Sequence, residues 1–341
     1  MPTSTPKDLL ARLERCLETR QELQANDQQQ AIRLFNGFYE GLPGLVIDLY
    51  ARTLVVANHA KAPETLDPSC AAAIAFYQQS LPWLESALVK QRHSADPLKK
   101  KGILVFGSRP ADRIVENGVR YALDLRLNQD CSFYLDTRNL RTWLLEHMAG
   151  KSVLNCFAYT GALGIAALAG NANQVIQTDL NSHALELAKK SSNLNQFTGR
   201  MGTLPLDFFK ALSRFKPNGD LFDCVILDPP LFSSTSQGTV SLLGNWLGLI
   251  NKARPLVAHG GCLIAINNAL YLSGKDMMDQ LEKLTTSGYV QIEEIIPVPE
   301  DVTGYSSTVC SGPPASPTPF NHPTKIVILR IARKDGRQAT R

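Results

Sequence analysis

Residues 151–232 constrain the fold of this chain more than any other stretch. The apolar run Ser152–Phe157 predicts a strand, which ends in a turn at Gly161 and leads into a helix of small residues. A second strand over 174–178 stops at Asp179. Small residues let a helix begin close to a strand end, so that backbone N–H groups face a crevice. The alternation of strands and helices predicts a parallel sheet that binds its ligand at the carboxyl ends of the strands.

The turn and the acid after it suggest the kind of ligand. Asp179 lies about 20 residues beyond the turn, where an acidic side chain accepts hydrogen bonds from two ribose hydroxyls. Capping of the next helix is the structural alternative. Gly161 and Gly164 lack a third glycine at the spacing of a dinucleotide fingerprint, which argues against a pyrophosphate and a nicotinamide-dependent dehydrogenase. A looser turn suits a nucleoside without phosphate, and S-adenosylmethionine is the common ligand of that kind.

A second candidate functional segment, a rigid corner of the backbone, follows the strand predicted over 222–227. This strand delivers the sequence Asp-Pro-Pro-Leu-Phe to the carboxyl end of the sheet. Asp228, Pro229, Pro230 and Phe232 are therefore candidate catalytic residues, because two prolines fix the backbone and an aromatic ring can stack on a flat base. An ordinary stop to a strand is the alternative for the two prolines. Beside the glycine turn and Asp179, the corner favours a methyl-transfer site.

Three motifs in order carry a resemblance to a known family. They are Leu42–Asp48 (Leu-Pro-Gly-Leu-Val-Ile-Asp), Phe133–Arg141 (Phe-Tyr-Leu-Asp-Thr-Arg-Asn-Leu-Arg) and Asn155–Gly161 (Asn-Cys-Phe-Ala-Tyr-Thr-Gly). The chain resembles class I S-adenosylmethionine-dependent methyltransferases, in detail the bacterial 23S ribosomal RNA enzymes of the cytosine-5 type and their guanine-N7 relatives. The resemblance implies an α/β fold, a Rossmann-like class I methyltransferase domain with a seven-stranded, mostly parallel sheet, preceded by a small α+β domain.

The resemblance also implies a set of cofactor-binding residues. In the family, the segment that matches 133–141 closes over the methionine end of the cofactor. There Asp136 can accept from the α-ammonium, and Arg138 or Arg141 can bind the carboxylate, unless the segment is only a helix start with surface charges. Asp207 can accept from the adenine amino group while the Phe208 ring covers the base, or it can simply cap the next helix. The candidates are Tyr134, Asp136, Arg138, Asn155, Phe157, Ala158, Thr160, Gly161, Asp179, Leu180, Asp207 and Phe208.

The end of the fifth predicted strand, 261–266, bears on the acceptor atom. Methylation at cytosine C5 requires a cysteine thiolate that adds to the base, and in the cytosine-5 relatives this cysteine ends the fifth strand. Here the strand ends in Asn267-Asn268, and Cys262 lies about five residues too early, roughly 16 Å along a strand. We therefore expect attack by a base nitrogen of RNA, with Asn267 as a catalytic candidate, unless the two asparagines form a polar turn.

Two other functions stay open from the sequence. The first is cytosine-5 methylation with Cys310 as a non-standard nucleophile, recruited from a loop over 303–323 that we expect above the acceptor pocket. The second is a catalytically silent S-adenosylmethionine-binding protein that binds RNA or assists assembly. The loop is rich in Gly, Ser and Pro, and disorder is expected for 306–318.

The rest of the chain predicts three regions: an N-terminal helix within 1–32, a small α+β domain over 33–128 on the RNA side, and a methyltransferase domain over 129–341. Helical spacing of leucines predicts the helix over 7–32, and self-association through it, giving a homodimer, is an alternative to packing on the next domain. Nothing before Arg33 is long or strand-rich enough for the RNA-binding PUA module with which the relatives often begin. Asn117-Gly118 is the strongest hairpin signal.

Charge and composition limit the partners. A net charge of +4 is too small to establish nucleic-acid binding, and the basic stretch at Lys99–Lys101 suits either phosphate contact or a solvated loop. The seven cysteines include no C-x-x-C pair, so we expect neither a metal site nor a disulfide framework. No apolar run approaches the length of a membrane span, and the acidic start is unlike a signal or transit peptide. We expect a cytoplasmic protein whose partner is ribosomal RNA.

Overall fold

The computed structural model describes residues 6–21, 28–235, 238–244 and 246–339, and the chain forms two compact units. Unit 1 comprises Met1–Asp136 and Pro299–Gly312, and unit 2 comprises Thr137–Val298 and Pro313–Arg341. A late segment of the chain thus returns to the unit that the N-terminal part forms. Within the described ranges, no helix has both the length and the apolar character to cross a membrane.

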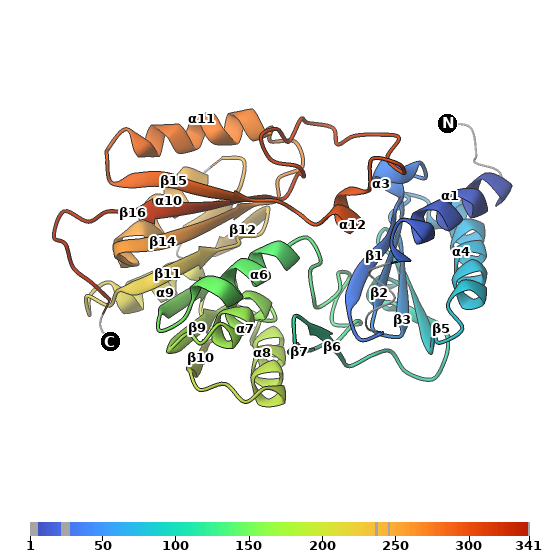
Figure 1. Ribbon diagram of the computed structural model, residues 1–341, viewed down its shortest axis with the longest axis horizontal. Helices are drawn as coiled ribbons and strands as arrows, with labels where there is room; N and C mark the ends of the chain where they lie inside the picture. The colour runs from blue at the N-terminus through green and yellow to red at the C-terminus, as the bar shows by residue number, and fades with distance from the viewer. Residues whose placement is uncertain (1–5, 22–27, 236–237, 245, 340–341) are drawn as a thin grey trace. The chain divides into compact units, whose positions relative to one another are not determined.

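The larger sheet of unit 1 has five strands in the order β1-β2-β3-β4-β5, so β5 lies at an edge (Figure 1). Its strands are β1 (Ala31–Asn36), β2 (Leu45–Tyr50), β3 (Thr53–Asn58), β4 (Ser86–Gln91) and β5 (Ile103–Phe106). All neighbouring pairs are antiparallel except β3 and β4, and helix α4 (Asp67–Ser80) connects these two parallel strands. Leu9 and Leu13 of α1 (Pro6–Glu18) and Tyr77 of α4 are buried in the apolar core of this sheet.

Shorter elements complete unit 1. They are α3 (Gly37–Glu40), η1 (Pro63–Thr65), α5 (Pro97–Lys101), β6 (Arg113–Glu116), β7 (Val119–Ala122) and α12 (Glu300–Thr303). The predicted hairpin at Asn117-Gly118 is confirmed: β6 and β7 pair antiparallel, and the two turn residues have φ angles of 51° and 77°. Such positive φ angles match the right-handed twist of the flanking strands.

The N-terminal helix is shorter than the predicted 7–32. Helix α1 ends at Glu18, and Arg20 in the following turn is fully buried. Of the remaining predicted span, residues 22–27 lie outside the described residues, and β1 begins at Ala31. Leucine spacing could not reveal the turn that follows Glu18 or the burial of Arg20 within it.

The sheet of unit 2 confirms the predicted seven-stranded, mostly parallel architecture, with strand order β10-β9-β8-β11-β14-β16-β15. Five neighbouring strands run parallel, and β16 pairs antiparallel with both β14 and β15. The strands are β8 (Ser152–Cys156), β9 (Gln174–Thr178), β10 (Arg200–Leu204), β11 (Phe222–Leu227), β14 (Val257–Asn267), β15 (Val290–Ile296) and β16 (Lys325–Ile331). Nearly every residue of β11 and β16 is buried, as expected of strands that are covered on both faces.

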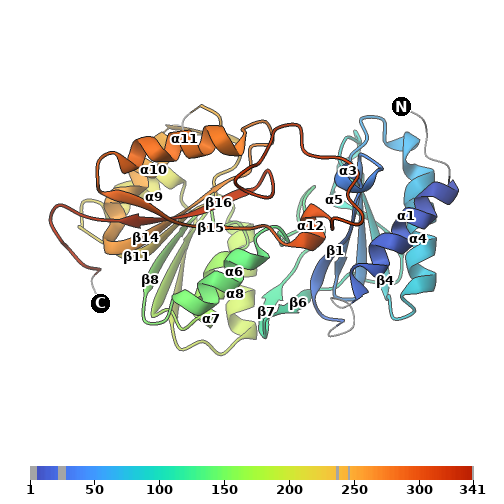
Figure 2. The ribbon, with the colours of Figure 1, turned by 45° about the horizontal axis from the view of Figure 1, so that its top comes forward.

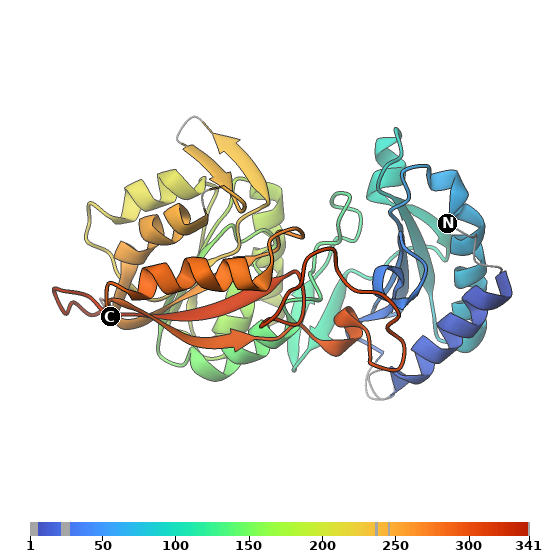
Figure 3. The same cartoon turned by 90° about the horizontal axis from the view of Figure 1, so that it is seen from above.

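Helices cover both faces of this sheet (Figure 2). One group is α6 (Arg138–His147), α7 (Ala162–Ala169) and α8 (Ser182–Leu194); the other is α9 (Phe208–Phe215), α10 (Trp246–Ala253) with η2 (Arg254–Leu256), and α11 (Gly274–Thr285). Apolar side chains of α9, α10 and α11 share one core with alternate residues of β8, β11, β14 and β16. A separate hairpin, β12 (Phe232–Thr235) and β13 (Gly238–Ser241), projects from unit 2 and is yellow to orange in Figure 3.

The prediction of disorder for 306–318 is wrong. In unit 1, the Cys310 N–H donates to Tyr39 O at 2.8 Å, and Ser311 Oγ donates to Phe38 O at 2.6 Å. In unit 2, the Gly274 N–H donates to Ser316 O at 2.9 Å. The segment is held by backbone and side-chain hydrogen bonds to residues far away in sequence, which its Gly, Ser and Pro content could not indicate.

Candidate active site

The strand order of the unit 2 sheet reverses between β8 and β11. From β8 the chain builds β9 and β10 on one side, then crosses back to β11 on the other side. Strands β8 and β11 are neighbours, and at their carboxyl ends Cys156 of β8 is opposite Leu227 of β11. The turn after β8 and Asp228 after β11 therefore begin side by side, at the position where open α/β sheets bind ligands.

The turn after β8 has an unusual backbone. Phe157, Tyr159 and Gly161 have φ angles of 58°, 51° and 78°, and the first two are not glycine. A non-glycine residue in this region costs on the order of 1 kcal/mol or more and persists only where its surroundings hold it. Here the Ala158 N–H donates to Thr178 O at 2.9 Å, and the Gly161 N–H donates to Ala158 O at 2.7 Å. The sheet therefore holds a preformed turn at the carboxyl end of β8.

The glycines of the turn allow close packing and leave backbone donors available. A Cβ on Gly161 would lie 2.5 Å from Gln177 Nε2, and one on Gly164 would lie 2.6 Å from Gln177 Cδ. Helix α7 can thus approach β9 only because both positions are glycine. Gly161 caps α7 without a side-chain hydrogen bond, so the first N–H groups of the helix have no intrahelical acceptor. Such groups suit a carboxylate or another electron-rich ligand group.

Asp179 directly follows β9, and each of its two carboxylate oxygens accepts one backbone hydrogen bond. Its Oδ2 accepts from the Tyr159 N–H at 2.8 Å, and its Oδ1 accepts from the Asn181 N–H at 2.8 Å. The cap of α8 is Asn181, whose Oδ1 accepts from the Ala184 N–H at 3.1 Å. Because a carboxylate offers about four acceptor positions, Asp179 retains capacity for hydroxyl donors. Leu180 beside it is 58% exposed, which suits contact with a flat ligand.

Asp207 and Phe208 have structural roles in this structure. The Asp207 Oδ1 accepts from the Lys210 N–H at 3.0 Å, so Asp207 caps α9. The Phe208 ring is only 3% exposed and stacks on Phe157, with 5.1 Å between the ring centroids. This burial corrects the expected role of the Phe208 ring, which cannot cover a base. It belongs to the apolar face of α9, which packs into the core.

Asn155 and Gln177 form an amide pair beneath the turn. The Asn155 Nδ2 donates to Gln177 Oε1 at 2.9 Å, and the Gln177 Nε2 donates to Gly161 O at 3.2 Å. The pair thereby ties β8, β9 and the turn together. Asn155 Oδ1 is buried and has no hydrogen-bond partner within the described part of the chain. A buried acceptor without a partner favours a water or a ligand group at this position, so the residues present fit a bound nucleoside cofactor.

The acceptor corner consists of Asp228, Pro229, Pro230 and the hairpin that follows them. Asp228 is half-buried, whereas Phe232 at the start of β12 is 66% exposed. The Leu242 N–H donates to Leu231 O at 3.1 Å, which fixes the corner to the end of the hairpin. The exposed ring can therefore stack on a base while the prolines keep the backbone rigid.

Asn267 stands beside this corner, but its side chain is not available to a substrate. It is fully buried; its Nδ2 donates to Leu242 O at 3.4 Å and its Oδ1 accepts from the Ala269 N–H at 2.9 Å. The exposed amide at the end of β14 is that of Asn268. This corrects the expected role of Asn267, which links β14 to the hairpin.

Lys325 extends the same network, and sequence reasoning missed it. Its backbone is opposite Asn267 in the β14–β16 pair, and its side chain is fully buried. The Lys325 Nζ donates to Ala269 O at 3.1 Å and to Pro323 O at 2.5 Å. Hydrogen bonds thus connect the acceptor corner to β16 through Leu242, Asn267 and Ala269. The one signal in the sequence is a lysine at the start of an otherwise apolar strand.

Burial of Lys325 leads to a test by pH. Burial lowers the pKa of Lys325 from 10.5 to about 8. Between pH 8 and 10.5 the unfolded chain therefore binds a proton at this lysine that the folded chain has released, so the free energy of unfolding rises with pH. We expect urea unfolding to show this rise in the wild type, relative to Lys325→Met, across pH 8 to 10. Parallel pH curves for the two proteins would show that Lys325 is charged throughout this range.

Residues 133–141, which the family resemblance assigns to the methionine end of the cofactor, include the division between the two units after Asp136. Tyr134 and Asp136 belong to unit 1, and Arg138 begins α6 in unit 2. Arg141 is buried, and its Nη1 donates to Thr137 Oγ1 at 2.8 Å in the first turn of α6. Arg141 thus stabilises the start of the helix, and roles in cofactor binding for Tyr134, Asp136 and Arg138 stay predictions.

No thiol lies at the end of β14. Cys262 is 1% exposed, and its backbone is opposite Cys224 in the β11–β14 pair, five residues before Asn267. Cys310 belongs to unit 1, where its Sγ lies 3.5 Å from Tyr39 O. Across the described ranges, no group of three or more His, Cys, Asp or Glu side chains is arranged to hold a metal ion.

Comparisons with known proteins agree with this geometry. The model of a family described as S-adenosylmethionine-dependent methyltransferase matches residues 93–301. The ribosomal RNA large subunit methyltransferase I of Aeromonas hydrophila is 32% identical over 270 residues, which are 75% of this chain and 65% of the relative. The protein of the same name from Yersinia pseudotuberculosis is 30% identical over 283 residues, 81% of this chain and 69% of the relative. The chain thus spans about two thirds of the length of these relatives.

A solved structure supports the fold. A candidate S-adenosylmethionine-dependent methyltransferase from Streptococcus mutans superimposes with a TM-score of 0.81 at 20% identity, covering 97% of this chain and 83% of its own. The family match covers more than half of the chain, and it includes the turn after β8, Asp179 and the corner after β11. The chain therefore belongs to the S-adenosylmethionine-dependent methyltransferase family.

Proposed function

We propose that this protein transfers a methyl group from S-adenosylmethionine to a base nitrogen of ribosomal RNA. The observation that carries the proposal is the corner at Asp228, Pro229 and Pro230, which begins beside the turn after β8 at the reversal of the strand order. The name of the Aeromonas and Yersinia relatives supports ribosomal RNA as the substrate class. Work on ribosomal RNA implies a cytoplasmic location.

The residues divide into a cofactor side and an acceptor side. When bound, S-adenosylmethionine supplies an electrophilic methyl group. Asp179 would accept from its ribose hydroxyls, and the free N–H groups at the start of α7 would face its polar end. On the acceptor side, Asp228 would accept a hydrogen bond or a proton from the base, and the exposed Phe232 ring would stack on it.

A base nitrogen is the acceptor that these side chains suit. Carbon-5 of cytosine becomes nucleophilic only after a thiolate has added to the ring, whereas a ring or amino nitrogen needs only positioning and removal of a proton. The end of β14 carries Asn267 and Asn268 in place of a thiol. The proposal is tested by transfer of tritium from labelled S-adenosylmethionine to ribosomal RNA, followed by mass spectrometry of the nucleosides to identify the methylated atom.

Cys310 provides a test of the cytosine-5 alternative. We expect Cys310→Ala to transfer methyl groups within about two-fold of the wild-type rate, because base-nitrogen chemistry needs no thiol. Initial rates with tritiated S-adenosylmethionine and ribosomal RNA measure this. Ser311→Ala is the matched control, since Ser311 is the next residue of the same loop and its Oγ donates to Phe38 O of α3. A loss of activity in Cys310→Ala alone, by a factor of about 100 or more, would favour the covalent route.

A silent cofactor-binding RNA-binding or assembly factor is the other rival. Such a protein would bind S-adenosylmethionine and RNA without turnover. Nucleosides from cells with and without this gene distinguish the two: an enzyme leaves one methylated nucleoside that disappears with the gene, and a silent factor leaves the nucleosides unchanged.

A further inference from the structure

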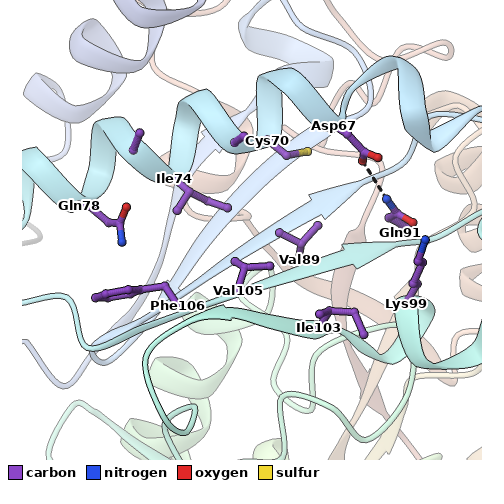
Figure 4. A pocket seen from close by; sticks show the side chains of 12 residues that line it. Asp67, Cys70, Ile74, Gln78, Val89, Gln91, Lys99, Ile103, Val105 and Phe106 are labelled. Carbon is purple, nitrogen blue, oxygen red and sulfur yellow. Dashed lines mark hydrogen bonds between the residues drawn. The ribbon is translucent and has the colours of Figure 1, made fainter.

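A groove of about 450 Å³ opens in unit 1 between helix α4 and the edge strand β5. Ala71, Ile74 and Ala75 of α4 line one side, and Val105 and Phe106 of β5 line the other; we call it the α4–β5 groove. Figure 4 shows the helix side chains above and the strand side chains below, pointing into the same space. The small alanines leave the helix face open toward the strand. The groove has the size of a ligand site and a largely apolar lining.

The strand side of the groove exposes large apolar side chains. Ile103, Val105 and Phe106 are 36%, 51% and 37% exposed, and all three belong to β5, a strand with only one neighbour in the sheet. Apolar side chains gathered at a sheet edge usually mark an interaction site. The groove is therefore expected to bind a partner that has an apolar or aromatic face.

One end of the groove is positively charged. Lys99 lines it, and Lys99, Lys100 and Lys101 form the last turn of α5. None of these three lysines forms an ion pair with any residue in the described ranges, whereas the nearby Arg92 pairs with Asp130 at 2.6 Å. A partner that filled the groove would therefore meet the charge of Lys99 at its end, and Lys100 and Lys101 in the same helical turn add positive charge near it. Anionic groups next to an apolar face match this arrangement.

Besides Lys99, the groove is lined by one carboxylate and two amide side chains, those of Asp67, Gln78 and Gln91. Gln91 Nε2 donates to Asp67 Oδ1 at 2.8 Å, and Asp67 Oδ1 also accepts from Asn58 Nδ2 at 3.2 Å, so the one carboxylate of the lining is already engaged. The amides of Gln78 and Gln91 offer both donors and acceptors at the groove. These are the groups that can recognise the edge of a base.

We propose that the α4–β5 groove binds an unpaired nucleotide of the RNA substrate, with its base against Val105 and Phe106 and its phosphate at Lys99–Lys101. The inference rests on the proposed function and extends it to a second RNA contact. Proteins bind single-stranded nucleic acid by combining a basic groove with aromatic side chains on which bases stack. An apolar protein segment would also fill the groove, but it would leave the three lysines without anions, and so the charges favour RNA.

Two kinds of variant distinguish the contact with the base from the contact with the phosphate. Ala75→Trp fills the groove from an exposed helix position without changing charge, and Phe106→Ala removes the exposed ring. Lys99→Ala with Lys101→Ala removes two charges at the groove end. The control is Lys275→Ala with Lys283→Ala, which removes two exposed lysines from α11 of unit 2. The assay is fluorescence anisotropy of the full chain with a labelled single-stranded RNA of mixed sequence.

We expect Ala75→Trp and Phe106→Ala each to weaken RNA binding about ten-fold, in line with the loss of one stacked base. The Lys99 and Lys101 double variant is expected to lower the slope of log Kd against log salt by about 1.4, that is, about 0.7 for each phosphate contact on a single strand. The α11 control is expected to leave both quantities unchanged. If the lysine variant weakens binding while neither groove variant does, phosphate binds outside the groove and the inference is wrong.

Other outcomes also decide the question. Unchanged RNA binding in all groove and lysine variants overturns the inference and favours an apolar protein partner. Calorimetry with S-adenosylhomocysteine checks that each variant remains folded and keeps its cofactor site. If the wild type shows the expected RNA binding but transfers no methyl group to ribosomal RNA, the proposed function fails while the RNA contact in the groove stands.

Discussion

Replacing Asp228 with alanine is expected to lower kcat for methyl transfer by a factor of about 10²–10³ while S-adenosylmethionine affinity changes only a few-fold. Asp228 directly follows β11, so it lies at the strand end next to the turn after β8. Its half-buried carboxylate can accept from the base as positive charge develops on the attacking nitrogen. An interaction that strengthens in the transition state affects kcat more than ground-state binding.

This prediction requires two measurements, the rate of methyl transfer and the affinity for the cofactor. Initial rates with ribosomal RNA give kcat, and calorimetry with S-adenosylhomocysteine gives the affinity of the cofactor side. Asp279→Ala is the control, because it removes an exposed carboxylate from α11. If Asp228→Ala loses cofactor affinity as strongly as it loses rate, Asp228 belongs to the cofactor side. If kcat is unchanged, this corner is not where the base is held.

The sheet of unit 2 could be predicted closely because its signals are local. The strands predicted over 174–178 and 222–227 have those bounds in β9 and β11, and β8 ends one residue earlier than predicted, at Cys156. Short apolar runs bounded by glycine, proline or an acid leave little freedom in where a buried strand begins and ends. The same signals placed the turn after β8 and the corner after β11 at the ends of strands, and the structure shows that these two strands are neighbours.

The roles of single side chains could not be predicted, because they depend on contacts between distant segments. Asn267 and Asn268 are neighbours of the same type, and the buried one, Asn267, is opposite Lys325 of β16 and donates to Leu242 O at the end of the hairpin. The burial of Phe208 depends on Phe157. Lys325 is a lysine in the interior, against the usual preference of that residue for the surface. Each case required the packing of elements that are separate in sequence.

Loss of Arg20 is expected to destabilise unit 1 by about 3–5 kcal/mol, because it leaves a carboxylate buried without its charge partner. Arg20 and Glu40 are both fully buried, and Arg20 Nη2 donates to the two Glu40 oxygens at 3.0 and 3.2 Å. Arg20 also donates to Arg33 O at 2.7 Å and to Asp301 O at 3.0 Å. It thus joins β1, α3 and α12, and α12 belongs to the returning segment Pro299–Gly312.

The effect is measured for unit 1 alone by amide hydrogen exchange of β1 in increasing urea, comparing Arg20→Ala with the wild type. Arg52→Ala is the matched control: it removes an arginine from the exposed Arg52–Glu85 pair and is expected to cost at most about 1 kcal/mol. Arg20→Met with Glu40→Gln is expected to recover part of the loss, since neither substituted side chain carries a charge. Equal losses for Arg20→Ala and Arg52→Ala would mean that water reaches the Glu40 carboxylate, and that the apolar core rather than this ion pair holds the returning segment in place.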